Sequence, residues 1–270
     1  MGMSALLAET TRLLTMFQDK EKGINASVAA AIAAVPEMSK DFYVNAIAGD
    51  DDVGTGAFSK PFKTIAKAVK AIPYGGGGSI KLFGHEHVLG NITVSFKNIT
   101  ISTASGETVK PTLRNVCLPA SNGTLDNRTT GFLMDSATIV LSGIRVRTAD
   151  YVVLGAAAND IYTGLFRRND RPMGMYHLTN CEIELGDTPL ARHTINSQIG
   201  VSSFYLNKIS RVGPVVLNTA LVELVGTPII FASGGNTLPA GGKWLGDYLT
   251  GVIQDSNGAV RNVISNLVLA

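Results

Sequence analysis

The fold of this chain is decided by residues 42–73, which read FYVNAIAGDDDVGTGAFSKPFKTIAKAVKAIP. The first three residues are β-formers and predict a short strand. Residues 49–56 are mostly glycine, which permits positive φ, and aspartate, whose side chain can bond its own backbone. We therefore expect a strand, then a turn-rich loop, and then a helix encoded by the remaining residues.

This helix has recognisable ends and one apolar face. Ser59 is expected to cap it, Pro61 suits its first turn, and Pro73 with the glycines at 75–78 stops it. The apolar residues at helical spacing are Phe62, Ile65, Ala66, Val69 and Ile72. A helix this short needs its apolar face covered. Because a strand is expected at 79–83, we interpret the helix as a lid on the open end of a stack of strands.

An internal repeat runs through the rest of the chain. Each copy has a strand, a small polar corner such as Ser142-Gly143, and a second strand. The copies are 92–101, 138–146, 175–185, 215–224 and 260–269. Aligned on Ile99, Ile144, Cys181, Ala220 and Leu267, they lie 45, 37, 39 and 47 residues apart, a period typical of stacked arrays. No copy can bury its apolar face alone, so stacking is expected. A β-sandwich would show tight hairpins, whereas long excursions separate these copies.

The stretch at 42–73 resembles the opening of many pectate-lyase-like right-handed β-helices, which are frequent in tail spikes and tail fibres of bacteriophages. The matching residues are Tyr43, Val44, Gly49, Asp50, Gly54, Thr55, Pro61, Phe62, Thr64, Ile65, Ala68, Val69, Ile72 and Pro73. The resemblance implies a mainly β chain folded as a right-handed parallel β-helix. It also implies assembly into trimers.

Three parts are expected along the chain: a helical stem at 1–41, the capping strand, loop and helix at 42–78, and the parallel β-helix at 79–270. The stem follows a seven-residue register with apolar seam residues at Leu7, Leu14, Phe17, Ile24, Val28 and Val35. The charge of Glu21 in the seam makes the coiled coil imperfect, and a break near Gly23 is expected. We interpret the stem as a self-association element; a helix packed on its own domain is the alternative. The seam leaves the number of chains open, and the resemblance implies three.

Composition argues against several classes of partner. The formal net charge of +2, with 16% charged residues, gives no sign of nucleic-acid binding. Charged residues interrupt the apolar residues near the N-terminus, so neither a signal peptide nor a membrane span is expected. Cys117 and Cys181 are interpreted as reduced packing residues of a protein made in a cytoplasm.

No cofactor or metal is predicted. His177 and His193 lack partners at metal-ligand spacing. The acidic run at 50–52 has two interpretations, a site for a hard cation and turn geometry. The resemblance favours turn geometry.

Three carboxylates are candidates for catalysis. Glu182 and Glu184 lie at i and i+2 of one strand, so they share a face about 7 Å apart. Acid–base glycoside hydrolysis needs two carboxylates roughly 5–10 Å apart. Glu223 is expected one coil further on, aligned with Glu184. Many spikes of the resembled family cleave polysaccharide with carboxylates on the outer strand face, but solubilising charge is the interpretation that we favour here.

Two groups of residues are candidates for binding. The first is an arginine-rich cluster, whose guanidinium forks suit the phosphates and carboxylates of bacterial glycans. It consists of Tyr162, Phe166, Arg167, Arg168 and Arg171. The second is Trp244 with Tyr248, whose rings could stack on a sugar. Contacts between subunits, or anchoring of loops, explain both groups equally well.

These expectations converge on a phage tail fibre or tail spike component without catalytic activity, located in the virion tail. As a homotrimer it would attach to polysaccharide on the bacterial surface or to other tail and baseplate proteins. A polysaccharide-degrading spike, acting as a glycoside hydrolase or lyase, is the main alternative. A connector of fibres in the baseplate is the third.

Overall fold

The structure is a computed structural model that describes residues 2–34, 39–119, 125–150, 163–168, 174–193, 200–212 and 219–267. The chain forms two compact units, Met1–Glu37 and Met38–Ala270. It is mainly β, with large parallel sheets and an N-terminal helix, as the sequence predicts. Three residues to which the sequence assigns a role, Val35, Tyr162 and Arg171, lie outside the described residues.

The first unit is one long helix, α1 (Met3–Ala34). Good helix formers dominate it, and Arg12 forms an ion pair with Glu9 across one turn at 2.6 Å. The break expected near Gly23 is absent, because α1 continues through this residue. Five predicted seam residues are each 51–70% exposed: Leu7, Leu14, Phe17, Ile24 and Val28. The apolar stripe of α1 is therefore uncovered.

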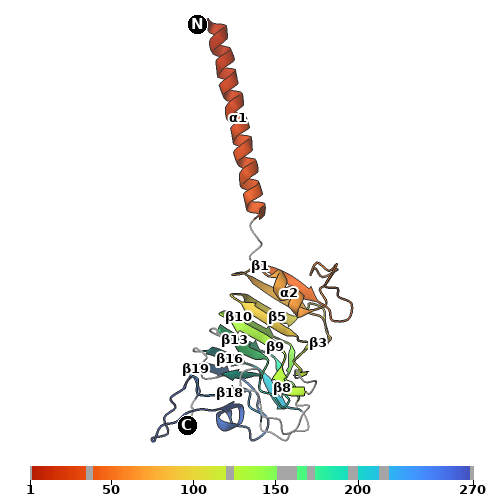
Figure 1. Ribbon diagram of the computed structural model, residues 1–270, viewed down its shortest axis with the longest axis vertical. Helices are drawn as coiled ribbons and strands as arrows, with labels where there is room; N and C mark the ends of the chain where they lie inside the picture. Colours follow the sequence, from red (N-terminus) through yellow and green to blue (C-terminus); the bar gives the residue numbers. More distant parts are fainter. Residues whose placement is uncertain are drawn as a thin grey trace. The chain divides into compact units, whose positions relative to one another are not determined.

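The second unit is built on three parallel sheets, and the main sheet has eight strands. Figure 1 shows these strands stacked in chain order, from β1 at one end of the unit to β19 near the other. Their bounds are β1 (Ser39–Val44), β2 (Gly77–Leu82), β5 (Asn98–Thr103), β10 (Ala137–Ser142), β13 (Gly174–Thr179), β16 (Gly200–Tyr205), β19 (Ile229–Gly234) and β21 (Val263–Ser265).

The two other sheets run beside it with shorter strands. The second sheet contains β3 (Glu86–Val88), β6 (Thr112–Arg114), β11 (Arg145–Arg147), β14 (Glu182–Leu185) and β17 (Lys208–Arg211). The third sheet contains β4 (Asn91–Ser95), β9 (Gly131–Asp135), β12 (Phe166–Arg168), β15 (Ala191–His193), β18 (Val222–Leu224) and β20 (Leu249–Thr250). An antiparallel pair, β7 (Cys117–Pro119) and β8 (Leu125–Thr129), stands apart from them.

The chain visits the three sheets in turn. From β2 to β18 each pass places one strand in the main sheet, the next in the second and the next in the third, with β7 and β8 inserted in one pass. The length of a pass varies: Gly77 pairs with Asn98, 21 residues on, and Asn98 pairs with Thr138, 40 residues on. Parallel pairing explains these lengths, because a hairpin cannot connect parallel strands.

The predicted repeat is right at one step and wrong at the next. Arg145 pairs with Glu182, which reproduces the 37-residue spacing. The interval from Cys181 to Ala220, however, contains a further pass with β16 and β17. The sequence of β16 lacks the alternation of apolar and polar residues that predicts a strand, because the polar Ser202 occupies an inward position. Much of what the sequence suggests to be excursions therefore consists of strands.

Alternate residues of each strand point into a common core. One inward column follows the register of the main sheet through Ile80, Ile101, Leu141, Leu178 and Phe204, all of them buried. Each such side chain contributes roughly 1.5–3 kcal/mol relative to an exposed one. The corners that follow the main-sheet strands also stack, since the N–H groups of Gly143, Asn180 and Leu206 each donate to a carbonyl of the next pass. These three residues, and Gly235 at the corner after β19, have φ between +54° and +67°.

The helix of the 42–73 stretch is α2 (Ile65–Ala71), which packs on β1 and β4. Its predicted face is correct except that Ala68 is buried and Ala66 is exposed. The predicted cap is wrong. Ser59 lies in a tight turn closed by the Lys60 N–H on the Ala57 carbonyl. Thr64 caps the helix instead, and its hydroxyl accepts from the Lys67 N–H at 3.2 Å.

Backbone N–H groups of the acidic loop and of the residues just before α2 hold the loop's carboxylates. The Asp51 carboxylate accepts from the N–H groups of Lys63 and Thr64 at 2.8 and 3.0 Å, and from the Thr64 hydroxyl at 2.6 Å. The N–H groups of Val53 and Asp52 donate to Asp50 and lower its pKa. These contacts are those of turn geometry. Gly78, predicted to help stop the helix, lies in β2, where an added Cβ would lie 2.9 Å from Ile72 Cδ1 of the segment after α2.

Candidate functional site

The exposed face of the second sheet carries the two carboxylates predicted for catalysis. Residues alternate along its short strands, so Val146 and Ile183 enter the core while their neighbours face outward. The register places Arg145 beside Glu182 and Arg147 beside Glu184. This pairing of opposite charges on adjacent strands is the stabilising arrangement for a sheet surface.

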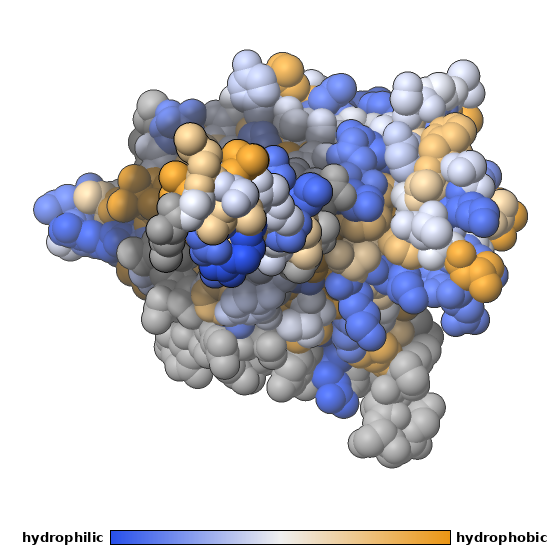
Figure 2. Space-filling model, turned by 90° about the horizontal axis from the view of Figure 1, so that it is seen from above, coloured by the Kyte–Doolittle hydropathy of each residue, from blue (hydrophilic) through white to orange (hydrophobic). Residues whose placement is uncertain are grey.

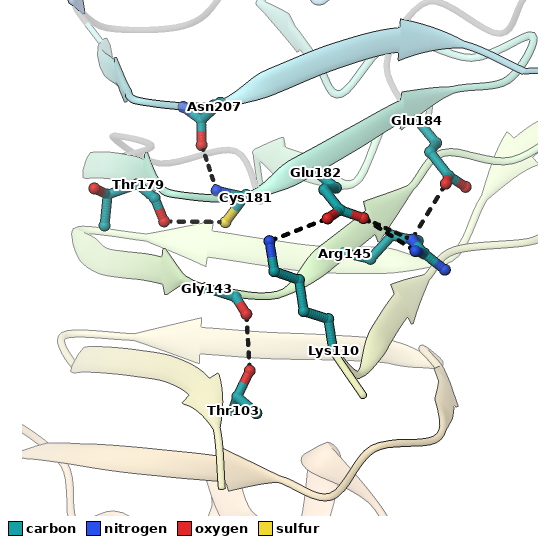
Figure 3. A network of polar contacts seen from close by, with 9 residues as sticks. All are labelled: Thr103, Lys110, Gly143, Arg145, Thr179, Cys181, Glu182, Glu184 and Asn207. Carbon is teal, nitrogen blue, oxygen red and sulfur yellow. Dashed lines mark hydrogen bonds and ion pairs between the residues drawn. The ribbon is translucent and has the colours of Figure 1, made fainter. Parts of the chain in front are cut away.

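Both carboxylates are ion-paired, as Figure 3 shows. The Lys110 ammonium donates to Glu182 Oε1 at 3.1 Å, and the Arg145 guanidinium donates to Glu182 Oε2 at 3.0 Å. Arg145 Nε also lies 3.2 Å from Glu184 Oε1. The hydrogen bonds from Lys110 and then Arg145 lower the pKa of Glu182. A general acid of a glycosidase needs a raised pKa instead, so Glu182 is a poor proton donor.

Glu223 does not join these two residues. It lies in β18 of the third sheet, where its register partner is Arg192, and the Arg192 Nε is 3.4 Å from a Glu223 carboxylate oxygen. The register neighbours of Glu184 are Arg147 and Ser210. The predicted stacking of Glu223 beside Glu184 is therefore wrong, because the alignment behind it omitted the pass with β16 and β17.

The arginine-rich cluster is not an exposed surface where the structure describes it. Phe166 is in the core, between Phe132 and Tyr176, with ring centroids 5.9 and 4.6 Å away. Arg167 is 2% exposed, and its guanidinium donates to Asn91 Oδ1. The prediction that these two residues bind a ligand is wrong. Arg168 lies in β12, and its side chain is outside the described part of the chain.

Trp244 and Tyr248 pack at the C-terminal end of the core, in the turn η1 (Trp244–Tyr248), which the Leu249 N–H closes on the Trp244 carbonyl. The Trp244 ring meets Phe231 at a centroid distance of 5.5 Å. Tyr248 is buried, and the guanidinium carbon of Arg211 lies 4.5 Å from its ring centroid. Arg211 also donates to the Asp247 carbonyl at 2.8 Å. Tyr248 is therefore not available to a sugar, and Trp244 is half-buried in the same cluster.

Three buried polar side chains, Tyr176, His193 and Ser202, form a hydrogen-bonded group in the core. Tyr176 OH lies 3.1 Å from His193 Nε2 and accepts a hydrogen bond from the Ser202 hydroxyl at 2.6 Å. All three side chains are buried, and burial lowers the pKa of His193 to about 4. His193 is therefore a neutral core residue. Among the described residues, no three His, Cys, Asp or Glu side chains gather as a metal site.

The outer face of the main sheet carries a pocket that is not predicted from the sequence. It has a volume of about 240 Å³ and is lined by His177, Ser203, Phe204, Tyr205, Ala232, Ser233, Gly234 and Asn266. Hydrophobic side chains are also exposed elsewhere, and Figure 2 shows them scattered among hydrophilic ones on the face seen from above. The sequence signal for the pocket is the small residues at outward positions of 200–205 and 229–234, which become visible once these are known to be strands.

Comparison with known proteins identifies no relative. No protein-family model matches the chain, and neither a curated protein nor a solved structure is significantly similar to it. Within the described residues, no helix is long and apolar enough to cross a membrane.

Proposed function

We propose that the chain is a structural component of a bacteriophage tail fibre or tail spike, and that its second unit is a right-handed parallel β-helix. The observation that carries the proposal is the repeated visit to three parallel sheets in one order, directly after the 42–73 stretch. Connections between parallel strands of one sheet are right-handed in about 98% of cases. The stretch resembles the opening of β-helices that are frequent in phage tails.

The uncovered stripe of α1 supports self-association. Its exposed residues follow a seven-residue register, which is the pattern that buries a seam between helices. Three chains are proposed because the resembled family is trimeric. The polar Thr10 and the charged Glu21 lie in the same seam, so the proposed coiled coil is weaker than one with an entirely apolar seam.

The ion pairs of the three candidate carboxylates agree best with a role without catalysis. The two residues closest to a glycosidase pair share one guanidinium, and the hydrogen bonds to Glu182 favour its charged form. The third is paired with Arg192 in another sheet. The proposed role is attachment, either to glycan on the bacterial surface or to other tail proteins.

Immunogold electron microscopy tests this proposal. Antibodies raised against the chain are applied to virions of the phage or prophage whose genome encodes it, and label is expected on the tail. Label confined to the head would contradict an accessible tail location. The same holds if the particles carry no label but mass spectrometry, after mild disruption, still detects the chain in them. Absence of the chain from purified virions would contradict the whole proposal.

A further inference from the structure

The outer face of the main sheet differs in chemistry from that of the second sheet. From β10 to β19, a stretch whose four strands are fully described, the outward residues include no Lys, Arg, Asp or Glu. The central outward column follows the register through Val140, His177, Ser203 and Ala232. A solvent-exposed sheet face usually carries charge, as the second sheet does. A neutral face with a hollow in it therefore points to a ligand.

The hollow is formed around one exposed aromatic ring. Tyr205 is 51% exposed at the end of β16, and its ring lies against Gly234 of the next strand. A Cβ on Gly234 would lie 3.0 and 3.1 Å from two ring atoms. The glycine thus allows the ring to lie close to the sheet, with the pocket beside it. Asn266 also lines the pocket, and its amide bonds the N–H and carbonyl of Ser233 at 2.9 and 2.7 Å.

Two hydrogen-bonding groups line the pocket without being used. The Ser203 hydroxyl and the His177 imidazole make no hydrogen bond to any described residue. Partial burial lowers the pKa of His177, so the ring is neutral at pH 7 and offers one donor and one acceptor. The pocket therefore presents an apolar ring together with neutral hydrogen-bonding groups.

This combination selects among ligands by charge and size. A phosphate or carboxylate would find no Lys or Arg among the lining residues to pair with it. A purely apolar ligand would leave the serine and histidine unsatisfied. The volume of about 240 Å³ is below the roughly 300–1,000 Å³ of pockets for drug-sized ligands. An uncharged sugar ring meets all three limits, because it has an apolar C–H face and a rim of hydroxyls.

We propose that this pocket binds one neutral sugar unit of a glycan, with the sugar's C–H face on the Tyr205 ring and its hydroxyls on Ser203 and His177. The proposal rests on the proposed attachment function and names the site and the ligand class. It replaces the arginine-rich cluster and Trp244 with Tyr248 as the place where a glycan is held.

Saturation-transfer NMR on the full chain tests the site. The probes are the methyl α-glycosides of glucose, galactose and mannose together with N-acetylglucosamine, and the charged comparators are glucuronic acid and glucose 6-phosphate. At least one neutral sugar is expected to bind, and the charged sugars are expected not to. Tyr205→Ala and Ser203→Ala should each weaken that binding, Tyr205→Ala by about tenfold or more. Tyr74→Ala is the matched control, since Tyr74 is exposed but lies outside the pocket.

The outcomes separate this site from the proposed function. Failure of all four neutral sugars to bind, equal binding of a charged sugar, or unchanged binding in Tyr205→Ala would each overturn the pocket. In any of these cases, tail labelling by the antibody would leave the attachment function standing. Sugar binding that Tyr205→Ala removes, in a chain absent from virions, would support the pocket and overturn the phage assignment. Thermal melting of each variant checks that a lost signal is not lost folding.

Discussion

At the scale of single residues, buried His193 makes the stability of the core depend on pH. Its neutral ring lies against Tyr176 in a site without room for a charge, and burial lowers its pKa to about 4. In the unfolded chain the same ring takes up a proton near pH 6.5. Between these two values only the unfolded state gains the proton, so the free energy of unfolding falls as the pH falls from 6.5 towards 4.

The size of this effect is measurable by urea unfolding. Between pH 7 and pH 5 we expect His193 alone to remove about 2 kcal/mol of stability. The control is His193→Gln, which cannot titrate but retains a polar atom. His87 and His177, whose pKa values are also lowered by burial, are present in both proteins and cancel. An equal pH dependence in the two proteins would show that His193 does not titrate as described.

The carboxylates of the second sheet give a second prediction. Glu182→Gln combined with Glu184→Gln removes charges that are partly exposed, so stability should change by only about 1 kcal/mol or less. Attachment to host cells should be unchanged, and no new reducing ends should be released from host polysaccharide by either protein. Release by the natural chain that the double substitution removes would make the protein a depolymerase.

Leu206 gives a third prediction, because its backbone is strained. Its φ of +54° lies in the left-handed region. At the equivalent corners Asn180 has the same φ, and the glycines Gly143 and Gly235 have φ of +67° and +62°. Asparagine tolerates this conformation better than leucine. Leu206→Asn should raise the free energy of unfolding by up to about 1 kcal/mol, measured by urea unfolding at pH 7. A lower value than that of the natural chain would mean that packing of the leucine outweighs the strain.

At the scale of elements, the lid is the best test of how the stack is closed. Ile65 is 4% exposed on the inner side of α2, and the adjacent Ala66 is exposed. Ile65→Asp places an unpaired charge in the core and should cost several kcal/mol, giving insoluble or unfolded protein. Ala66→Asp adds the same charge to the same helix on its outer side and should leave yield and melting temperature nearly unchanged. Equal behaviour of the two variants would contradict the lid.

The same elements show how much of the fold can be predicted from the sequence. The first strand, the loop and the helix of the 42–73 stretch are predictable because turn residues and apolar periodicity coincide there. The cap is not, since Ser59 and Thr64 are both good caps and only the turn at 57–60 decides between them. The β16 pass and the pocket of Tyr205 are hidden because Ser202 points inward and is satisfied by Tyr176, a partner 26 residues away in sequence.

At the scale of the whole molecule, the chain combines a long helix that has an uncovered apolar stripe with a stack of parallel strands. The seam of α1 makes a specific prediction about assembly. Leu14→Asp places a charge in the seam and should dissociate the oligomer or weaken it by at least tenfold in concentration. Ala26→Asp, on the side of the helix opposite the seam, should leave the oligomer intact. Sedimentation velocity compares the two variants, and equal dissociation would show that the predicted register is wrong.

Native mass spectrometry of the full chain tests the central claim, a trimeric tail protein joined through α1, most directly. We expect a dominant species of three times the 28.4 kDa chain, which persists at micromolar concentration and neutral pH. A dominant single-chain species, with α1 shown to be intact by the measured mass and helical by circular dichroism, would contradict it.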